Sequence, residues 1–65
     1  ANINRNIILQ DIPRYVDYLL TNGNLLLSGF LNEDVELIRS EVEKLGLQFV
    51  SHKNKNKWNL LHFKK

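Results

Sequence analysis

Three consecutive leucines between two glycines place the strongest constraint on how this chain can fold. Leu25, Leu26 and Leu27 lie between Gly23 and Gly29, which leaves too few residues for a buried helix. A half-exposed strand would alternate apolar and polar residues, whereas a short continuous apolar run is typical of a strand covered on both faces. The run therefore predicts a buried strand in an α/β sheet with parallel neighbours.

A helix is expected before this strand. Asp11 is placed to cap its first turn, and Pro13 then falls where a missing N–H does little harm. The segment 21–23 ends the helix, with Asn22 or Gly23 able to take the left-handed conformation. Apolar residues repeat at three- and four-residue steps, and the expected buried stripe is Ile12, Tyr15, Val16, Leu19 and Leu20.

A second helix is expected after the leucine strand. Asn32 is placed to cap it, and Gly46 is placed to close it. Acidic residues early in this segment suit the positive end of the helix dipole. The expected buried stripe is Val35, Ile38, Val42 and Leu45.

Two strands are expected at the end of the chain, at 47–53 and 57–64, joined by the asparagine-rich segment 54–56. The last strand has apolar residues on both faces, whereas the strand before it carries a lysine. We therefore expect the last strand to lie antiparallel inside the sheet, with the 47–53 strand at the edge. The apolar residues of the last strand are Trp58, Leu60, Leu61 and Phe63.

Length and composition limit what the chain can do alone. Its 65 residues include no cysteine, which excludes disulfides and thiolate metal sites and fits a reducing compartment. A unit of this size is marginal without a metal, a disulfide or a partner. The chain begins at Ala1 with neither a methionine nor an apolar leader, so we expect a processed or excised chain without a signal peptide. No apolar run approaches the roughly 20 residues that span a bilayer.

The charge is divided between the two parts of the chain. Residues 1–43 carry three basic and seven acidic side chains, a net charge of −4, whereas residues 44–65 carry six lysines and no acidic residue. We expect these lysines to solubilise a hairpin and to protect an edge strand, which does not favour a nucleic-acid partner. The alternative is an RNA grip made of Lys53, Lys55, Lys57, Lys64 and Lys65, with Trp58 and Phe63 between them.

Three segments together carry a resemblance to a known family. They are Ala-Asn-Ile-Asn-Arg-Asn at 1–6, Asn-Leu-Leu-Leu-Ser-Gly-Phe at 24–30, and Trp58 near the start of the last strand. In this order and spacing they resemble the end of PrmA, the bacterial methyltransferase family that modifies large-subunit ribosomal protein eleven. The resemblance implies that residues 1–65 are the C-terminal portion of a Rossmann-like class I methyltransferase domain. It also implies an inserted antiparallel last strand, and we expect the two helices on opposite faces of the sheet.

The resemblance further implies a substrate site and a cofactor. Asn2 and Ile3 match the family's segment after the fourth strand, where the asparagine side chain and the next backbone carbonyl accept hydrogen bonds from the substrate amine. The polar continuation at 4–6 departs from the family, and Arg5 fits an exposed turn better than a contact to an acidic substrate. S-adenosylmethionine is expected for the parent protein only, because the glycine-rich turn and the acidic residue that bind it are not in this chain.

Other candidate sites have little support. His52 and His62 lie on adjacent expected strands, but two histidines without a nearby cysteine or carboxylate make a poor metal site. We assign no catalytic residue, no metal ligand and no cofactor ligand within the chain. The remaining polar groups lack a catalytic partner at motif spacing: Ser28, Ser40, Glu41 and Glu43.

Two functions from different classes follow. The first is the C-terminal segment of a cytoplasmic S-adenosylmethionine-dependent methyltransferase with a ribosomal-protein substrate, inactive as an isolated fragment. The second is a non-catalytic module that binds RNA or forms a homodimer through the exposed edge of the leucine strand. Trp58 discriminates between them, because a ring in the core favours the methyltransferase sheet and an exposed ring among lysines favours RNA.

Overall fold

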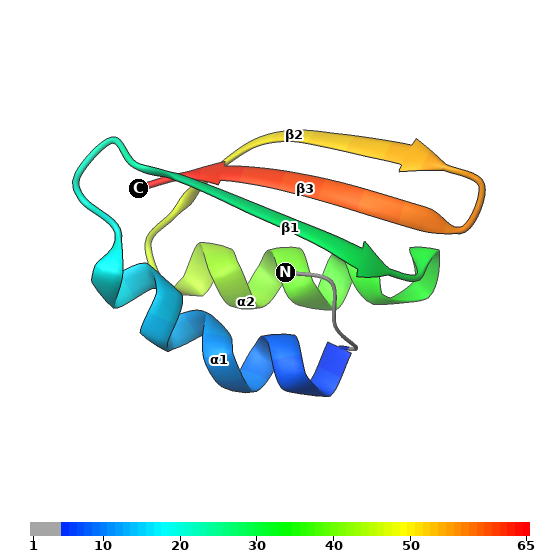
Figure 1. The fold of residues 1–65 in the computed structure, drawn as a ribbon, viewed down its shortest axis with the longest axis horizontal. Helices are drawn as coiled ribbons and strands as arrows, with labels where there is room; N and C mark the ends of the chain where they lie inside the picture. Colours follow the sequence, from blue (N-terminus) through cyan, green and yellow to red (C-terminus); the bar gives the residue numbers. More distant parts are fainter. Residues whose placement is uncertain (1–4) are drawn as a thin grey trace.

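The computed structural model describes the backbone of residues 5–65 and the side chains of residues 8–65, so Asn2 and Ile3 lie outside the described residues. The chain forms two layers, a three-stranded sheet and a pair of helices (Figure 1). None of the described helices is long and apolar enough to cross a membrane. The elements are α1 (Arg5–Tyr18), β1 (Asn24–Phe30), a 3-10 turn (Asn32–Asp34), α2 (Val35–Lys44), β2 (Gln48–Lys55) and β3 (Trp58–Lys64).

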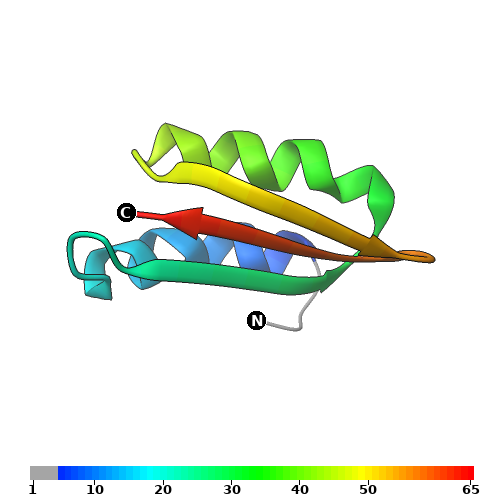
Figure 2. The same cartoon turned by 90° about the horizontal axis from the view of Figure 1, so that it is seen from above.

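The last strand lies in the centre of the sheet, as the apolar residues on both its faces predict. The strand order is β1-β3-β2, and β3 is antiparallel to both neighbours (Figure 2). The inserted position of β3 and the edge position of β2 are therefore confirmed. β1 and β2 run in the same direction but do not pair with each other, so β1 has no parallel neighbour among the described strands.

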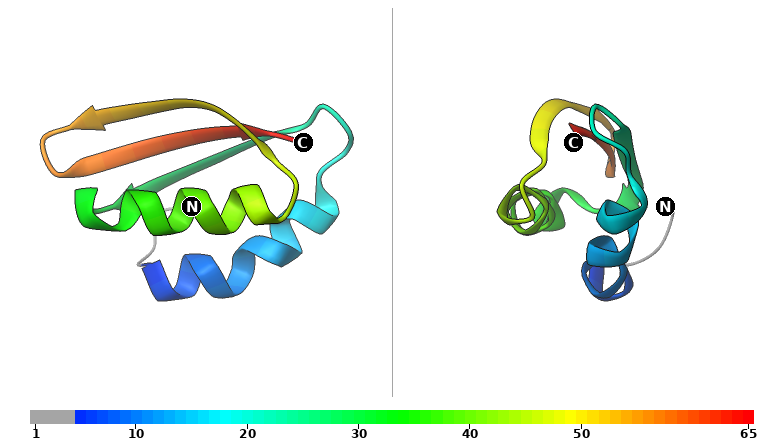
Figure 3. Two further views of the ribbon diagram at one scale, coloured as in Figure 1. Left: turned by 180° about the vertical axis from the view of Figure 1, so that it is seen from behind. Right: turned by 90° about the vertical axis from the view of Figure 1, so that its left-hand side faces the viewer.

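Both helices pack on the same face of the sheet, and the prediction that they lie on opposite faces is wrong (Figure 3). Each helix has a single apolar stripe, and a chain of this size can bury only one core, so both stripes turn toward it. Ile12 of α1, Ile38 of α2 and Leu61 of β3 are all almost completely buried there. The full core is Ile8, Ile12, Val16, Leu27, Phe30, Val35, Ile38, Val42, Leu47, Leu61 and Phe63.

The opposite face of the sheet, called the outer face below, is not covered by either described helix. Leu27 lies opposite Leu61 on the core side, whereas Leu26 lies opposite His62 on the outer face. Leu27 is buried, but Leu26 remains 54% exposed. The leucine run is therefore covered on one face rather than on both, which corrects the prediction made from its composition.

Helix α1 begins at Arg5 rather than at Asp11, so Pro13 lies inside the helix and not in its first turn. An interior proline removes one backbone hydrogen bond and costs about 3 kcal/mol. The helix bends near its middle (Figure 1), as expected for a proline kink. Burial of three apolar side chains around Pro13 outweighs this cost, namely Ile8, Ile12 and Val16.

Gly46 closes α2 as predicted, whereas α1 ends at Tyr18, before the predicted stop at 21–23. Gly46 has φ 93°, and Asn22, with φ 69°, lies in the turn between α1 and β1. The hairpin turn is Asn56-Lys57 rather than 54–56, and Asn56 takes the left-handed conformation with φ 58°. Two residues of the predicted stripes lie beyond the helix ends and are exposed, namely Leu20 and Leu45.

The C-terminal lysine closes the end of α1. Nζ of Lys65 donates to the backbone carbonyls of Val16, at 2.7 Å, and Leu19, at 2.8 Å. The backbone of Lys65 pairs with Asn22 and Gly23. A cation at a helix C-terminus bonds carbonyls that lack helical partners and interacts favourably with the helix dipole. Lys65 therefore has a structural role and does not belong to an RNA-binding set of lysines.

The variant Lys65→Ala should lower the free energy of unfolding by about 1 kcal/mol, because both carbonyls lose a charged donor. Urea unfolding followed by circular dichroism measures the loss. Lys64→Ala is the matched control, since it removes the same charge from an exposed neighbour in β3. Equal losses in the two variants would contradict the capping role.

Candidate functional site

A buried asparagine connects the hairpin to the end of β1. Asn59 in β3 is 3% exposed and is the buried polar residue of the described core region. Its Nδ2 donates to the carbonyl of Phe30, at 3.1 Å, and to Oδ1 of Asn32, at 2.9 Å. A buried amide of this kind stabilises a fold only when its donors and acceptor are all satisfied. The carboxyl end of β1 is thereby held against the start of β3.

The acceptor side of Asn59 is also occupied. Nδ2 of Asn54 donates to Oδ1 of Asn59 at 3.0 Å, and to Oδ1 of Asn32 at 2.7 Å. Nε2 of His52 lies 2.7 Å from Oδ1 of Asn59 and donates in the tautomer that protonates this nitrogen. We call Asn32, Asn54, Asn59 and His52 the asparagine cluster. Its members come from three separate parts of the chain.

The cluster changes the interpretation of Asn32. Neither the 3-10 turn nor α2 receives a side-chain cap at its N-terminus. Oδ1 of Asn32 instead accepts from Asn54 and Asn59. The predicted capping role of Asn32 is therefore wrong, because two amide donors from the hairpin compete successfully for the oxygen.

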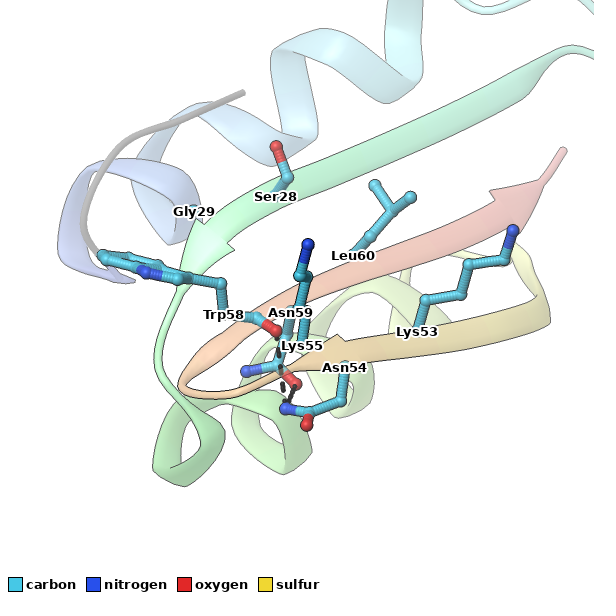
Figure 4. Close-up of a pocket in the computed structure, with 8 residues that line it drawn as sticks. All are labelled: Ser28, Gly29, Lys53, Asn54, Lys55, Trp58, Asn59 and Leu60. Atoms are coloured by element: carbon cyan, nitrogen blue, oxygen red, sulfur yellow. Dashed lines mark hydrogen bonds between the residues drawn. The ribbon is translucent and has the colours of Figure 1, made fainter.

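An open groove of about 740 Å³ lies on the outer face, next to the hairpin turn (Figure 4). Trp58 stands at the hairpin end of the groove and is 57% exposed. Lys53 and Lys55 of β2 extend along the same groove. Trp58 lies directly opposite Lys55 in the strand register. The complete lining is Ser28, Gly29, Lys53, Asn54, Lys55, Trp58, Asn59 and Leu60.

Only some of the lysines and aromatic residues that the sequence suggested as an RNA-binding set line this groove. Phe63 is completely buried in the core, so it cannot present a ring to a ligand. Lys65 caps α1 at the other end of the sheet. The residues of that set that line the groove are Lys53, Lys55 and Trp58.

The two histidines lie on different faces of the sheet. His52 pairs with Leu61 on the core side, whereas His62 pairs with Ser51 and lies on the outer face. Nε2 of His62 is 2.8 Å from Oδ1 of Asn24. The hairpin therefore does not bring the two imidazoles together, and no group of three metal-ligating side chains occurs within the described part of the chain.

The ends of several elements meet on one side of the molecule. α1 begins there, β1 and β2 end there, and the hairpin turn lies at the same side (Figures 1 and 2). In open α/β sheets, ligands bind beyond the carboxyl ends of strands that run in the same direction. The segment that contains Asn2 and Ile3 directly precedes α1 in the sequence.

Comparison with known proteins assigns the family. The family model described as ribosomal protein L11 methyltransferase (PrmA) matches residues 1–65. The chain belongs to the PrmA family. It is 49% identical over 63 residues to the ribosomal protein L11 methyltransferase of Bacteroides thetaiotaomicron, and 44% identical over 63 residues to that of Porphyromonas gingivalis. Each match covers 97% of this chain but 22% of the relative.

The PrmA assignment confirms the resemblance carried by residues 1–6, 24–30 and Trp58. The position of Trp58 does not support the assignment. A methyltransferase sheet was expected to hold this ring in its core, but the ring is exposed beside Lys53 and Lys55. The asparagine cluster was missed by sequence reasoning. The only local signal for it is the excess of asparagine around the hairpin, which the sequence interpretation used to predict a turn.

Proposed function

We propose that residues 1–65 are the C-terminal segment of a class I, S-adenosylmethionine-dependent methyltransferase domain whose parent modifies amines of a ribosomal protein in the cytoplasm. The observation that supports this most strongly is the PrmA match along the entire chain. The inserted antiparallel β3, between two strands of common direction, also agrees with the end of a Rossmann-like sheet. The chain spans 22% of the length of the relatives it matches.

The described residues do not fit the adenosine part of S-adenosylmethionine. A dinucleotide-like site needs a glycine-rich turn after a strand and an acidic residue that binds the ribose hydroxyls. The groove on the outer face is lined by lysines and an indole, with no carboxylate. We therefore expect no methyl transfer and no measurable affinity for the cofactor when this chain is alone.

The contribution of this chain to the reaction is to position the substrate. The amide oxygen of Asn2 and the backbone carbonyl of Ile3 accept hydrogen bonds from the substrate amine. These bonds orient the nitrogen lone pair for in-line displacement, and the neutral amide does not stabilise the ammonium form as a carboxylate would. α1 begins on the side of the molecule where β1 and β2 end, and this arrangement supports a substrate site at the carboxyl ends of these strands.

A chimera tests this proposal. Residues 1–65 replace the matching segment of the Bacteroides thetaiotaomicron relative, and transfer of labelled methyl groups to protein L11 is measured. We expect the chimera to be active and this chain alone to be inactive. Asn2→Ala should lower kcat/KM by about 100-fold, because the amine loses its positioning acceptor.

Asn24→Ala is the matched control for the chimera, since Asn24 is an exposed asparagine whose amide contacts His62 on the outer face. It should leave kcat/KM within about twofold of the parent. An inactive but folded chimera, or equal losses in the two asparagine variants, would overturn the proposed role.

The homodimer expected through the exposed edge of the leucine strand stays a prediction. Sedimentation of this chain measures its oligomeric state directly.

A further inference from the structure

The turn between α1 and β1 contains the dipeptide Asn22-Gly23. We propose that Asn22 is a site of spontaneous deamidation, and that Lys65 restrains the reaction by holding this turn closed. Every group in the proposal belongs to the described residues. The proposal therefore depends neither on the methyltransferase assignment nor on what covers the outer face.

An asparagine followed by glycine is suited to this chemistry, because glycine has no side chain to obstruct ring closure. Hydroxide removes the proton from the backbone nitrogen of Gly23, and this nitrogen attacks Cγ of Asn22. The Cγ–Nδ2 bond breaks, the leaving nitrogen takes a proton from water and departs as ammonia, and a succinimide ring remains. Water then opens the ring at either carbonyl, which gives aspartate or isoaspartate at position 22.

The fold requires both residues of this pair. Asn22 has φ 69°, a left-handed conformation that asparagine tolerates better than most residues. A Cβ at position 23 would lie 2.8 Å from the backbone oxygen of Leu20, closer than real Cβ contacts, so glycine is needed there. The geometry that makes the turn therefore also places the reactive pair in it.

Hydrogen bonds engage the attacking nitrogen and the peptide groups around it. The N–H of Gly23 donates to the carbonyl of Leu20 at 2.8 Å, which disfavours its deprotonation. The carbonyl of Gly23 accepts from the N–H of Lys65 at 2.9 Å, and the N–H of Asn22 donates to the carbonyl of Lys65 at 3.0 Å. The end of β3 thus lies beside this turn (Figure 1). We infer that the nitrogen attacks only after the turn has opened.

The side chain of Lys65 connects this turn to the end of α1. Its Nζ donates to the backbone carbonyls of Val16 and Leu19. Loss of these two bonds raises the population of the open turn, and a reaction that requires local opening has a rate proportional to that population. Isoaspartate adds a carbon to the main chain between the N–H of residue 22 and the carbonyl of Gly23. Both of these groups pair with Lys65, so the reacted turn cannot pair in the same register.

Incubation of the chain at mildly alkaline pH, followed by tryptic digestion and tandem mass spectrometry, measures the conversion of Asn22 to the acid. A peptide of residues 19–27, which lacks Lys65, gives the rate for an open turn. We expect the folded chain to react at least about tenfold more slowly than this peptide. Asn56 is the internal control, since it also has a positive φ, of 58°, but precedes a lysine and should stay unmodified over the same period.

Lys65→Ala should raise the rate at Asn22 by about fivefold, because loss of the cap favours the open turn. Lys64→Ala removes the same charge from an exposed neighbour and should change the rate by less than about twofold. Exchange of the Gly23 amide hydrogen requires the same opening, so it should accelerate by the same factor as the reaction. In the unsubstituted chain, urea below the unfolding transition should raise both rates together, so the test does not depend on the folding of a variant.

The proposal is overturned if the folded chain reacts as fast as the peptide, or if another asparagine is converted before Asn22. Equal acceleration by Lys64→Ala and Lys65→Ala would also overturn it, because the restraint would then not come from the bonds of Lys65. The chimera assay measures methyl transfer and is unaffected by these outcomes, so the two proposals can fail separately.

Discussion

The variant Phe63→Ala should leave this chain unfolded at room temperature. Phe63 is completely buried on the central strand, and its ring meets Phe49 edge-on with centroids 5.8 Å apart. Truncating a buried phenylalanine costs about 3–5 kcal/mol. A core in a domain of this size supplies about the same net stability, so the loss removes the folded state. Circular dichroism and a urea titration of the variant measure this directly.

Leu60→Ala is the matched control for Phe63→Ala. Leu60 lies in the same strand but on the outer face, where it is only partly buried. Its truncation should cost less than about 1.5 kcal/mol and leave a cooperative unfolding transition. If both variants showed the same midpoint, the core would not be concentrated on the helical face of β3.

The second large loss of stability is expected for Asn59→Leu. Leucine has a similar size, but it leaves the buried carbonyl of Phe30 without the amide that donates to it, whereas Oδ1 of Asn32 keeps its bond from Asn54. It also removes the acceptor of Asn54 and His52. Each buried polar group left unsatisfied costs about 1–3 kcal/mol. Because Asn32, Asn54 and His52 are exposed and the Phe30 carbonyl is buried, we expect a loss of about 1–3 kcal/mol in the free energy of unfolding, measured in urea.

Asn24→Leu is the control for the asparagine cluster. Asn24 is exposed, and its amide contacts His62 alone, so its replacement should change stability by about 0.5 kcal/mol or less. Amide hydrogen exchange adds a local readout, since Asn59→Leu should raise exchange at the hairpin turn more than in α2. A loss below about 1 kcal/mol for Asn59→Leu would show that water satisfies the cluster as well as Asn59 does.

The exposed position of Trp58 does not discriminate between the two functional hypotheses, because the chain spans 22% of the relatives it matches and the described residues do not show what covers the outer face in a longer chain. The sequence argument treated a core ring as a sign of the methyltransferase and an exposed ring as a sign of RNA binding. The chain belongs to the PrmA family, yet its ring is exposed beside Lys55. β3 has two faces, of which one forms the core and the other carries the groove beside Trp58.

Local signals in the sequence determined much of the fold. The leucine run, the last apolar strand and Gly46 predicted β1, β3 and the end of α2, because turn chemistry and apolar periodicity act over a few residues. The inserted position of β3 followed from apolar residues on both its faces. The resemblance at 1–6 and 24–30 was sufficient for the family. The proposed roles of Asn2 and Ile3 also rest on sequence alone.

Only the tertiary structure decided the rest. Pro13 lies within α1 because burial of Ile8 and Ile12 outweighs its local cost. The helices share one face because the chain can build a single core. Asn32 bonds Asn59, 27 positions away, and no local pattern encodes a partner at that distance. The same is true of the groove, where the β2–β3 register places Trp58 opposite Lys55 and the β1–β3 pairing adds Ser28 and Gly29.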